Sequence, residues 1–171
     1  MKQVRKLIAI SSFMVGMVTL THHAGAQQKS QQEQLVGAWT LVSADSVRTD
    51  GSKVAVFGSN PKGTMGFSGD GHFALVQMRG DIPRLASNSR DQGTSDEYKA
   101  IVGGSLAYFG TYSLNEADKI ISIQLEGSTF ANLMGGEQKR IITNLTADEL
   151  TFTNPRNPSG TTLEVTWKRA R

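Results

Sequence analysis

Apolar and polar residues alternate along several short segments of the chain. In residues 161–169, Leu163, Val165 and Trp167 share one parity, and most residues between them are polar. Successive side chains of a β-strand point to opposite faces, so this pattern predicts a strand with one face packed and one face wet. The same alternation predicts further inward residues: Trp39, Leu41, Met65, Phe67, Phe73, Leu75, Ile121, Ile123, Leu125, Leu150 and Phe152.

Turn-forming residues separate these segments. Gly, Asp and Asn occur at 50–51, 69–71, 115–118 and 147–148, between β-prone stretches. Tight turns between sequential strands produce an antiparallel meander. About 8–10 such strands in one domain favour an all-β, up-and-down antiparallel barrel, because closure removes the exposed edges of a sheet.

One segment, 94–104, has a helical pattern instead. Thr94 and Glu97 match a capping box, in which a hydroxyl and a carboxylate satisfy backbone donors of the first turn. The preceding stretch, 79–92, lacks periodicity and is expected to be a long loop. We therefore expect the helix to cap or pack on the barrel, with the loop as part of a lid. Residues 130–134 also have near-helical apolar spacing, which fits either a one-turn helix at the barrel mouth or a plain connector.

The start of the chain is a separate unit. A basic beginning, a mostly apolar stretch at 7–20 and an A-x-A site at 24–26 describe a secretory signal peptide over residues 1–26. The apolar stretch is shorter than the roughly 18 residues that span a bilayer. We expect cleavage after Ala26, a disordered polar leader over 27–34 and one domain over 35–171. Such a protein would be periplasmic or secreted.

Removal of the signal peptide changes the charge and the available chemistry. Loss of Lys2, Arg5 and Lys6 lowers the 18 basic residues to 15, equal to the 15 acidic ones. A near-neutral domain gives no reason to expect a nucleic-acid partner, and no stable membrane insertion is expected after cleavage. The chain has no cysteine, and His72 is the last remaining histidine. We therefore expect neither a cofactor nor a transition-metal site, and the oligomeric state stays open.

Several segments, taken in order, resemble a known family. Gly37-Ala38-Trp39 matches G-x-W on a first strand, and it is followed by PKGTMGFSGDGHFALVQM, SDEYKAIVGGSLAYFGTYSLNEADK, EGSTFANLMGGEQKR and a closing LEVTWKRA. This succession resembles the bacterial lipocalin-like domain family over 35–169. The resemblance implies a lipocalin-like β-barrel, whose relatives bind, carry or chemically rearrange small apolar molecules.

The resemblance also implies a structural role for three residues. In lipocalins, a basic side chain near the last strand stacks on the G-x-W tryptophan and closes the barrel floor. Arg169 has the parity of the inward Trp167, so we expect Arg169 over Trp39, with Lys168 as the second choice. Such a cation over an indole contributes roughly 0.5–2 kcal/mol. The expected structural residues are Gly37, Trp39 and Arg169.

Several positions carry side chains suited to a ligand. Tyr108 and Tyr112 share one face and combine apolar rings with hydroxyl groups, which suits either a pocket or an aromatic core. Gln77 has inward parity, and an unpaired buried amide costs about 1–3 kcal/mol, so a ligand or water is its expected partner. Arg140 lies in a segment of ambiguous facing; outward is the default, and an inward arginine would need a carboxylate or an anionic ligand. The candidate ligand contacts are Tyr108, Tyr112, Gln77, Phe73, Phe67, Met65, Phe130 and Arg140.

The sequence contains no catalytic motif that identifies its function. The sequence has no G-x-S-x-G elbow, H-E-x-x-H site, P-loop or dinucleotide fingerprint. The favoured function is therefore the binding of a small hydrophobic molecule inside the barrel. One alternative is an isomerase or cyclase that uses Tyr108, Tyr112 or an acid as proton donor on an apolar substrate. The other is a fully packed barrel that serves as an interaction module.

Overall fold

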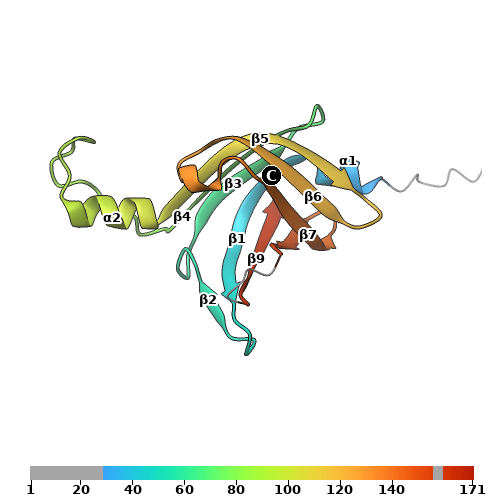
Figure 1. The fold of residues 1–171 in the computed structure, drawn as a ribbon, viewed down its shortest axis with the longest axis horizontal. Helices are drawn as coiled ribbons and strands as arrows, with labels where there is room; N and C mark the ends of the chain where they lie inside the picture. The colour runs from blue at the N-terminus through green and yellow to red at the C-terminus, as the bar shows by residue number, and fades with distance from the viewer. Residues whose placement is uncertain (1–28, 156–159) are drawn as a thin grey trace, which may run out of the picture.

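A computed structural model describes residues 29–155 and 160–171, and the predicted signal peptide over 1–26 lies outside them. The main feature is a nine-stranded antiparallel sheet that closes on itself (Figure 1). The strands are β1 (Gly37–Val47), β2 (Lys53–Ala55), β3 (Lys62–Phe67), β4 (His72–Met78), β5 (Ser105–Asn115), β6 (Ile120–Ser128), β7 (Glu137–Leu145), β8 (Glu149–Thr153) and β9 (Thr162–Arg169). The helices are α1 (Gln31–Leu35), α2 (Ser95–Gly103) and the 3-10 helix η1 (Ala131–Leu133).

Strands that follow one another in the sequence are neighbours around the barrel. β3 to β9 pair in order, and β1 pairs with β3 on one side and with β9 on the other. These pairings close a barrel of eight strands, and β2 adds one extra strand beside the end of β1. The predicted all-β, up-and-down antiparallel barrel is therefore confirmed.

The barrel has two different ends, which we call the floor and the mouth. The floor is the end where β1 begins at Gly37 and β9 ends at Arg169. The turns that join β3 to β4, β5 to β6 and β7 to β8 also lie there. The mouth is the opposite end, where the connections from β4 to β5, β6 to β7 and β8 to β9 lie.

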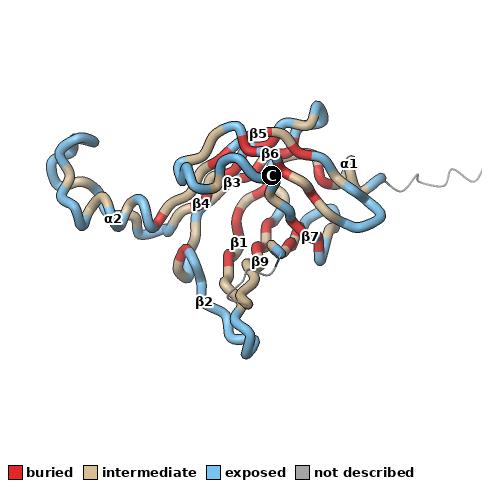
Figure 2. The backbone as a smooth tube through the Cα atoms, viewed as in Figure 1, coloured by how far each residue is buried: buried red, intermediate tan, exposed pale blue. Residues whose placement is uncertain are grey.

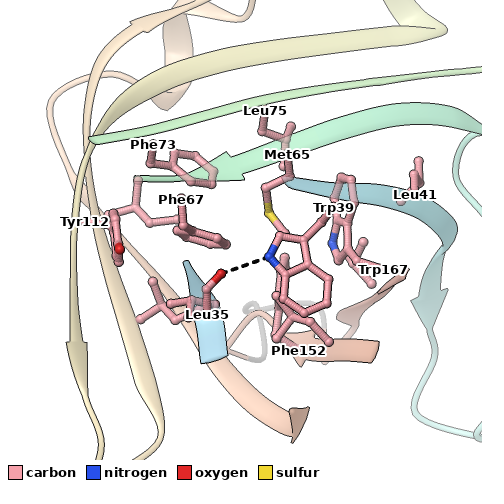
Figure 3. Packing of buried hydrophobic residues seen from close by; sticks show 14 of the residues in the cluster. Leu35, Trp39, Leu41, Met65, Phe67, Phe73, Leu75, Tyr112, Phe152 and Trp167 are labelled. Carbon is pink, nitrogen blue, oxygen red and sulfur yellow. Dashed lines mark hydrogen bonds between the residues drawn. The ribbon is translucent and has the colours of Figure 1, made fainter. Parts of the chain in front are cut away.

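Inward side chains form the core, and the buried residues, red in Figure 2, lie along the strands of the barrel. All the residues that the alternation predicts to face inward are buried except Leu163, which packs against the core as a partly buried residue. Trp39 and Trp167 are completely enclosed and lie close to each other in Figure 3. Burial of these large side chains supplies the main favourable term for closing the sheet.

α1 closes the floor. The Ser30 hydroxyl accepts from the Glu33 N–H and the Glu33 carboxylate accepts from the Ser30 N–H, so the helix begins with a capping box. Leu35 is completely buried, and its carbonyl accepts a 2.9 Å hydrogen bond from the Trp39 indole N–H (Figure 3). The prediction of disorder over 27–34 therefore fails from Ser30 onward, because burial of Leu35 and the capping bonds offset the loss of chain entropy.

α2 forms where the sequence predicts it, with the predicted capping box, but it neither caps nor packs on the barrel. It extends away from the mouth end of β4 and β5 (Figure 1), none of its residues is buried, and Val102 is 69% exposed. Tyr98 instead packs on the preceding loop, where its hydroxyl donates to the Arg90 carbonyl at 3.0 Å and accepts from the Gly93 N–H at 2.6 Å. The expected lid is wrong: α2 points away from the barrel, and its Tyr98 contacts the preceding loop instead.

The remaining helical segment is a single turn at the mouth. η1 follows Phe130, which is 52% exposed and therefore does not line the barrel as the sequence predicts. Leu133, within the turn, packs against the edge of the core. Among the described helices, none has both the length and the apolar character needed to cross a membrane.

Candidate functional site

Aromatic side chains fill the part of the interior next to the floor. The ring centroid of Phe67 lies 5.0 Å from that of Phe73 and 4.8 Å from that of Tyr112, and Phe73 lies 5.7 Å from Tyr108. Met65 is 1% exposed on the same inward face. These separations are those of favourable aromatic pairs. Phe67, Phe73 and Met65, which the sequence suggests as ligand contacts, are therefore packed core residues.

The Tyr112 hydroxyl makes its hydrogen bonds at the floor. It donates to the Ser68 carbonyl at 2.8 Å and accepts from the Gln32 side-chain amide at 3.0 Å. Burial raises the pKa of Tyr112; the hydrogen bond from Gln32 opposes this shift and the negative charge of Asp70 adds to it. Tyr112 thus ties α1 to the β3–β4 turn and belongs to the closed end rather than to a ligand pocket.

The predicted stacking at the floor is present. The guanidinium carbon of Arg169 lies 3.9 Å from the Trp39 ring centroid. Gly37 has a φ of 128°, and a Cβ there would lie 2.8 Å from Nη1 of Arg169, so both the backbone and the space require glycine. The Arg169 N–H groups donate to the carbonyls of Val36 at 2.8 Å, Ala147 at 3.0 Å and Gln34.

Farther toward the mouth, three polar side chains point into the barrel. Gln77 on β4, Tyr108 on β5 and Arg140 on β7 are only 4%, 6% and 6% exposed. Nη2 of Arg140 donates to the Tyr108 hydroxyl at 3.2 Å. Leu75 pairs with Tyr108 across β4 and β5, which makes Gln77 a diagonal neighbour of Tyr108 on the same face. We call Gln77, Tyr108 and Arg140 the polar cluster.

Arg140 faces inward, contrary to the default expected from the sequence. Along β7, Arg140 lies two residues before the buried Ile142 and shares its face, and it pairs with the buried Ile121 of β6. Both observations place its side chain on the inner face. Its Nη1 donates to the Lys139 carbonyl at 2.9 Å, and its guanidinium carbon lies 6.0 Å from the Phe152 ring centroid. Among the described residues, no Asp or Glu forms an ion pair with Arg140.

Other interior polar groups lack protein partners in the described part of the chain. The Gln77 side-chain amide makes no hydrogen bond there. The indole N–H of Trp167 and the side-chain oxygen of Asn154 are buried and unpaired. Alternation predicts that Trp167 faces inward, but whether its N–H meets an acceptor depends on residues far apart in sequence, so the sequence could not identify it.

Partly buried leucines pack against the core at both ends of the barrel, with Leu114 and Leu145 toward the floor. Leu106, Leu133 and Leu163 are the partly buried leucines toward the mouth. They supply apolar side chains beside the polar cluster. This arrangement of apolar walls with a few converging polar side chains is typical of small-molecule sites.

A hollow lies on the outer wall of the barrel. It encloses about 540 Å³ beside Ala38, Gly66, Ala74 and Phe109, with Glu126 at its edge. Phe109 is 52% exposed, and its ring lies over the backbone of Gly127. The hollow is open and almost entirely apolar, and it lacks the converging buried donors of the polar cluster. We therefore place the candidate site inside the barrel.

The sequence matches one protein family over most of its length. The family described as a lipocalin-like domain matches residues 36–170. A lipocalin-like protein from Bacteroides uniformis is 18% identical, covers 80% of this chain and 99% of its own, and has a TM-score of 0.45. A redesigned β-barrel, mFAP1, bound to DFHBI, is 17% identical, with 82% and 100% covered and a TM-score of 0.41. Among curated proteins, none matches the chain.

Proposed function

Because the chain belongs to the family of lipocalin-like domains, we propose that it binds a small, largely apolar molecule inside its barrel. We further propose that it does so in the periplasm or outside the cell, after removal of residues 1–26. Neither the ligand nor the compartment follows from family membership alone. The proposal therefore depends on the interior of this particular barrel.

The observation that carries the proposal is the group of polar side chains that point into the barrel beyond its aromatic floor. The floor half is packed by aromatic rings, with Phe67 and Phe73 only 2% and 3% exposed. Toward the mouth, Gln77, Tyr108 and Arg140 face inward, and the Gln77 amide has no hydrogen-bond partner among the described residues. An inward amide without a protein partner is available to a ligand group or a bound water.

Native mass spectrometry tests whether the protein carries a ligand. The protein is purified from a bacterial host under non-denaturing conditions and compared with a sample extracted with organic solvent. We expect an additional lipid-like mass that the extraction removes, because apolar walls retain apolar molecules. Binding of the neutral dye Nile red to the extracted protein should then restore occupancy. A clean apo mass together with no Nile red binding would refute the proposal.

Three variants locate the bound dye. Leu106→Trp adds bulk to the lining near the mouth and should weaken Nile red binding several-fold, as about 1–3 kcal/mol of overpacking predicts. Val102→Trp adds a similar bulk on the exposed α2 and is the matched control. Phe109→Ser removes the aromatic wall of the outer hollow and should leave dye binding unchanged. If Phe109→Ser abolishes binding while Leu106→Trp does not, the outer hollow is the site and the interior proposal fails.

A further inference from the structure

The buried guanidinium of Arg140 has more donors than the protein satisfies. An arginine side chain carries five N–H donors and no acceptor. In the described structure, its side-chain hydrogen bonds go to the Tyr108 hydroxyl at 3.2 Å and the Lys139 carbonyl at 2.9 Å. The residue is 6% exposed, so bulk water cannot reach most of its surface. The remaining donors have no hydrogen-bond partner among the described residues.

The positive charge of Arg140 is also uncompensated. The arginine–carboxylate pairs of the described residues lie on the surface, as between Arg79 and Asp81 at 2.8 Å. Arg169, the other inward arginine, is satisfied by the Trp39 face and by backbone carbonyls. Burial of a cation without a counter-charge costs free energy, and a bound anion would offset this cost.

The neighbours of Arg140 present further donors. The Tyr108 oxygen accepts the hydrogen bond from Arg140, so its own O–H can donate to another group. The Gln77 amide lies on the same inward face and has no partner in the described structure. The Phe152 ring covers one side of the guanidinium, with 6.0 Å between its centroid and the guanidinium carbon. Donors beside a cation favour a ligand group that is anionic and rich in acceptors.

We propose that the interior ligand carries a carboxylate, which binds the Arg140 guanidinium and the Tyr108 hydroxyl while its apolar remainder extends toward the mouth. This inference rests on the proposed binding inside the barrel and names the chemical class of the ligand. A planar carboxylate fits the guanidinium fork with two parallel hydrogen bonds. The partly buried Leu106, Leu133 and Leu163 then line the path of the apolar part.

Three probes with the same tail separate the inference from the function on which it rests. Dodecanoate, dodecanol and dodecyl phosphate are titrated below their micelle concentrations, with binding followed by calorimetry and by the fluorescence of Trp39 and Trp167. We expect dodecanoate to bind about tenfold or more tightly than dodecanol, as one charge-assisted hydrogen-bonded pair predicts. Equal binding of dodecanoate and dodecanol would overturn the carboxylate inference but leave the proposed function standing. Tighter binding of dodecyl phosphate than of dodecanoate would overturn the choice of carboxylate, and failure of all three would overturn both proposals.

Substitution of Arg140 distinguishes a ligand contact from a structural residue. Arg140→Met keeps most of the side-chain volume and removes the charge. It should abolish the preference for dodecanoate over dodecanol, whereas Lys139→Met, the exposed neighbour, should preserve it. Without ligand, Arg140→Met should melt at the same or a higher temperature, because an unpaired buried charge is lost. A lower melting temperature together with an unchanged dodecanoate preference would show a purely structural role.

A second variant guards against misfolding of the first. Tyr108→Phe removes the hydroxyl but keeps the ring that packs on Phe73 at 5.7 Å. It should weaken dodecanoate binding several-fold and leave dodecanol binding nearly unchanged, because only the carboxylate uses the hydroxyl. Equal effects on the two probes would contradict the assigned contact.

Discussion

Arg169 and Arg140 both direct a guanidinium group toward the barrel interior, but their surroundings differ. Arg169 lies over Trp39 and donates to backbone carbonyls around the floor. Arg140 has one hydroxyl and one carbonyl as acceptors. Paired donors stabilise a fold, whereas unpaired buried donors cost free energy. The same residue type therefore supports the floor at one position and suits an anionic ligand at the other.

Replacement of Arg169 by Ala tests the structural role. The change removes the cation over Trp39 and the hydrogen bonds to the floor carbonyls. We expect the free energy of unfolding to fall by about 2–4 kcal/mol, combining the stacking with the lost bonds. Urea denaturation measures it, and Arg171→Ala, at an 89% exposed side chain, is the control. A loss of stability no larger than that of the control would contradict the structural role of Arg169.

The turn before β4 provides a pH-dependent contribution at the floor. The Ser68 hydroxyl, followed by His72, lowers the pKa of Asp70 from its ordinary value of 3.8 to about 2. Because the folded-state pKa is lower than the unfolded one, the Asp70 carboxylate stabilises the fold above the unfolded pKa and loses this effect as the pH falls through the folded pKa. The stability difference between wild type and Asp70→Asn should therefore shrink between about pH 5 and pH 2. Urea denaturation across this range measures it, and a constant difference would be inconsistent with the shift.

At the scale of elements, both α-helices differ from what the sequence predicts. α1, in a segment expected to be disordered, closes the floor through the buried Leu35. α2, expected to be a lid, extends from the mouth with no buried residue. The capping boxes at Ser30 and Thr94 are alike. A capping box thus marks where a helix begins, but the position of the apolar residues relative to the barrel decides what the helix covers.

Removal of α2 should leave the barrel intact. Met78 pairs with Ser105, and the Arg79 N–H donates to the Gly104 carbonyl at 2.9 Å, so the ladder continues up to the point of removal. Residues 80–103 can be replaced by Asn-Gly, which forms the tight turn of a two-residue hairpin. We expect the melting temperature to change by only a few degrees, corresponding to about 1 kcal/mol or less. Circular dichroism measures it, and loss of the cooperative transition would show that α2 supports the barrel.

Truncation of Leu35 in α1 is the contrasting change. Leu35→Ala leaves a cavity beneath Trp39 at the floor, where the wild-type side chain is completely buried. We expect a loss of about 2–5 kcal/mol in the free energy of unfolding, since large-to-small core changes combine lost burial with a cavity. Urea denaturation gives the value, with Leu85→Ala in the loop before α2 as the matched control. Equal effects of the two truncations would argue against α1 as a floor.

At the scale of the whole molecule, the barrel has an aromatic floor and a group of inward polar side chains farther toward the mouth. Trp39, Arg169 and α1 hold the floor. The polar cluster and its leucine lining lie between the floor and the mouth. In the proposed function, the mouth is therefore the direction of ligand entry.

The proposed secretion makes a prediction for the whole chain. Expressed with its own start in a bacterial host, the protein should lose residues 1–26 and appear in the periplasmic or external fraction beginning at Gln27. Intact mass and N-terminal sequencing measure the product. Ala24→Leu and Ala26→Leu together should block processing, because the cleavage site requires small residues. Retention of Met1 in the wild-type protein, inside the cell, would refute the proposed location.

The sequence by itself determined the features that depend on near neighbours along the chain. Alternation identified the inward residues of the strands, from Trp39 to Trp167, because a strand turns successive side chains to opposite faces. The capping box of α2 and the Arg169–Trp39 stacking also followed from local pattern and resemblance. Tertiary structure alone decided which groups meet across the barrel: that Tyr112 bonds to the floor, that Arg140 faces inward beside Tyr108, and that α2 points away. The reason is physical. Whether a buried polar group meets a partner or solvent depends on strands far apart in sequence, and the register of those strands fixes the contact.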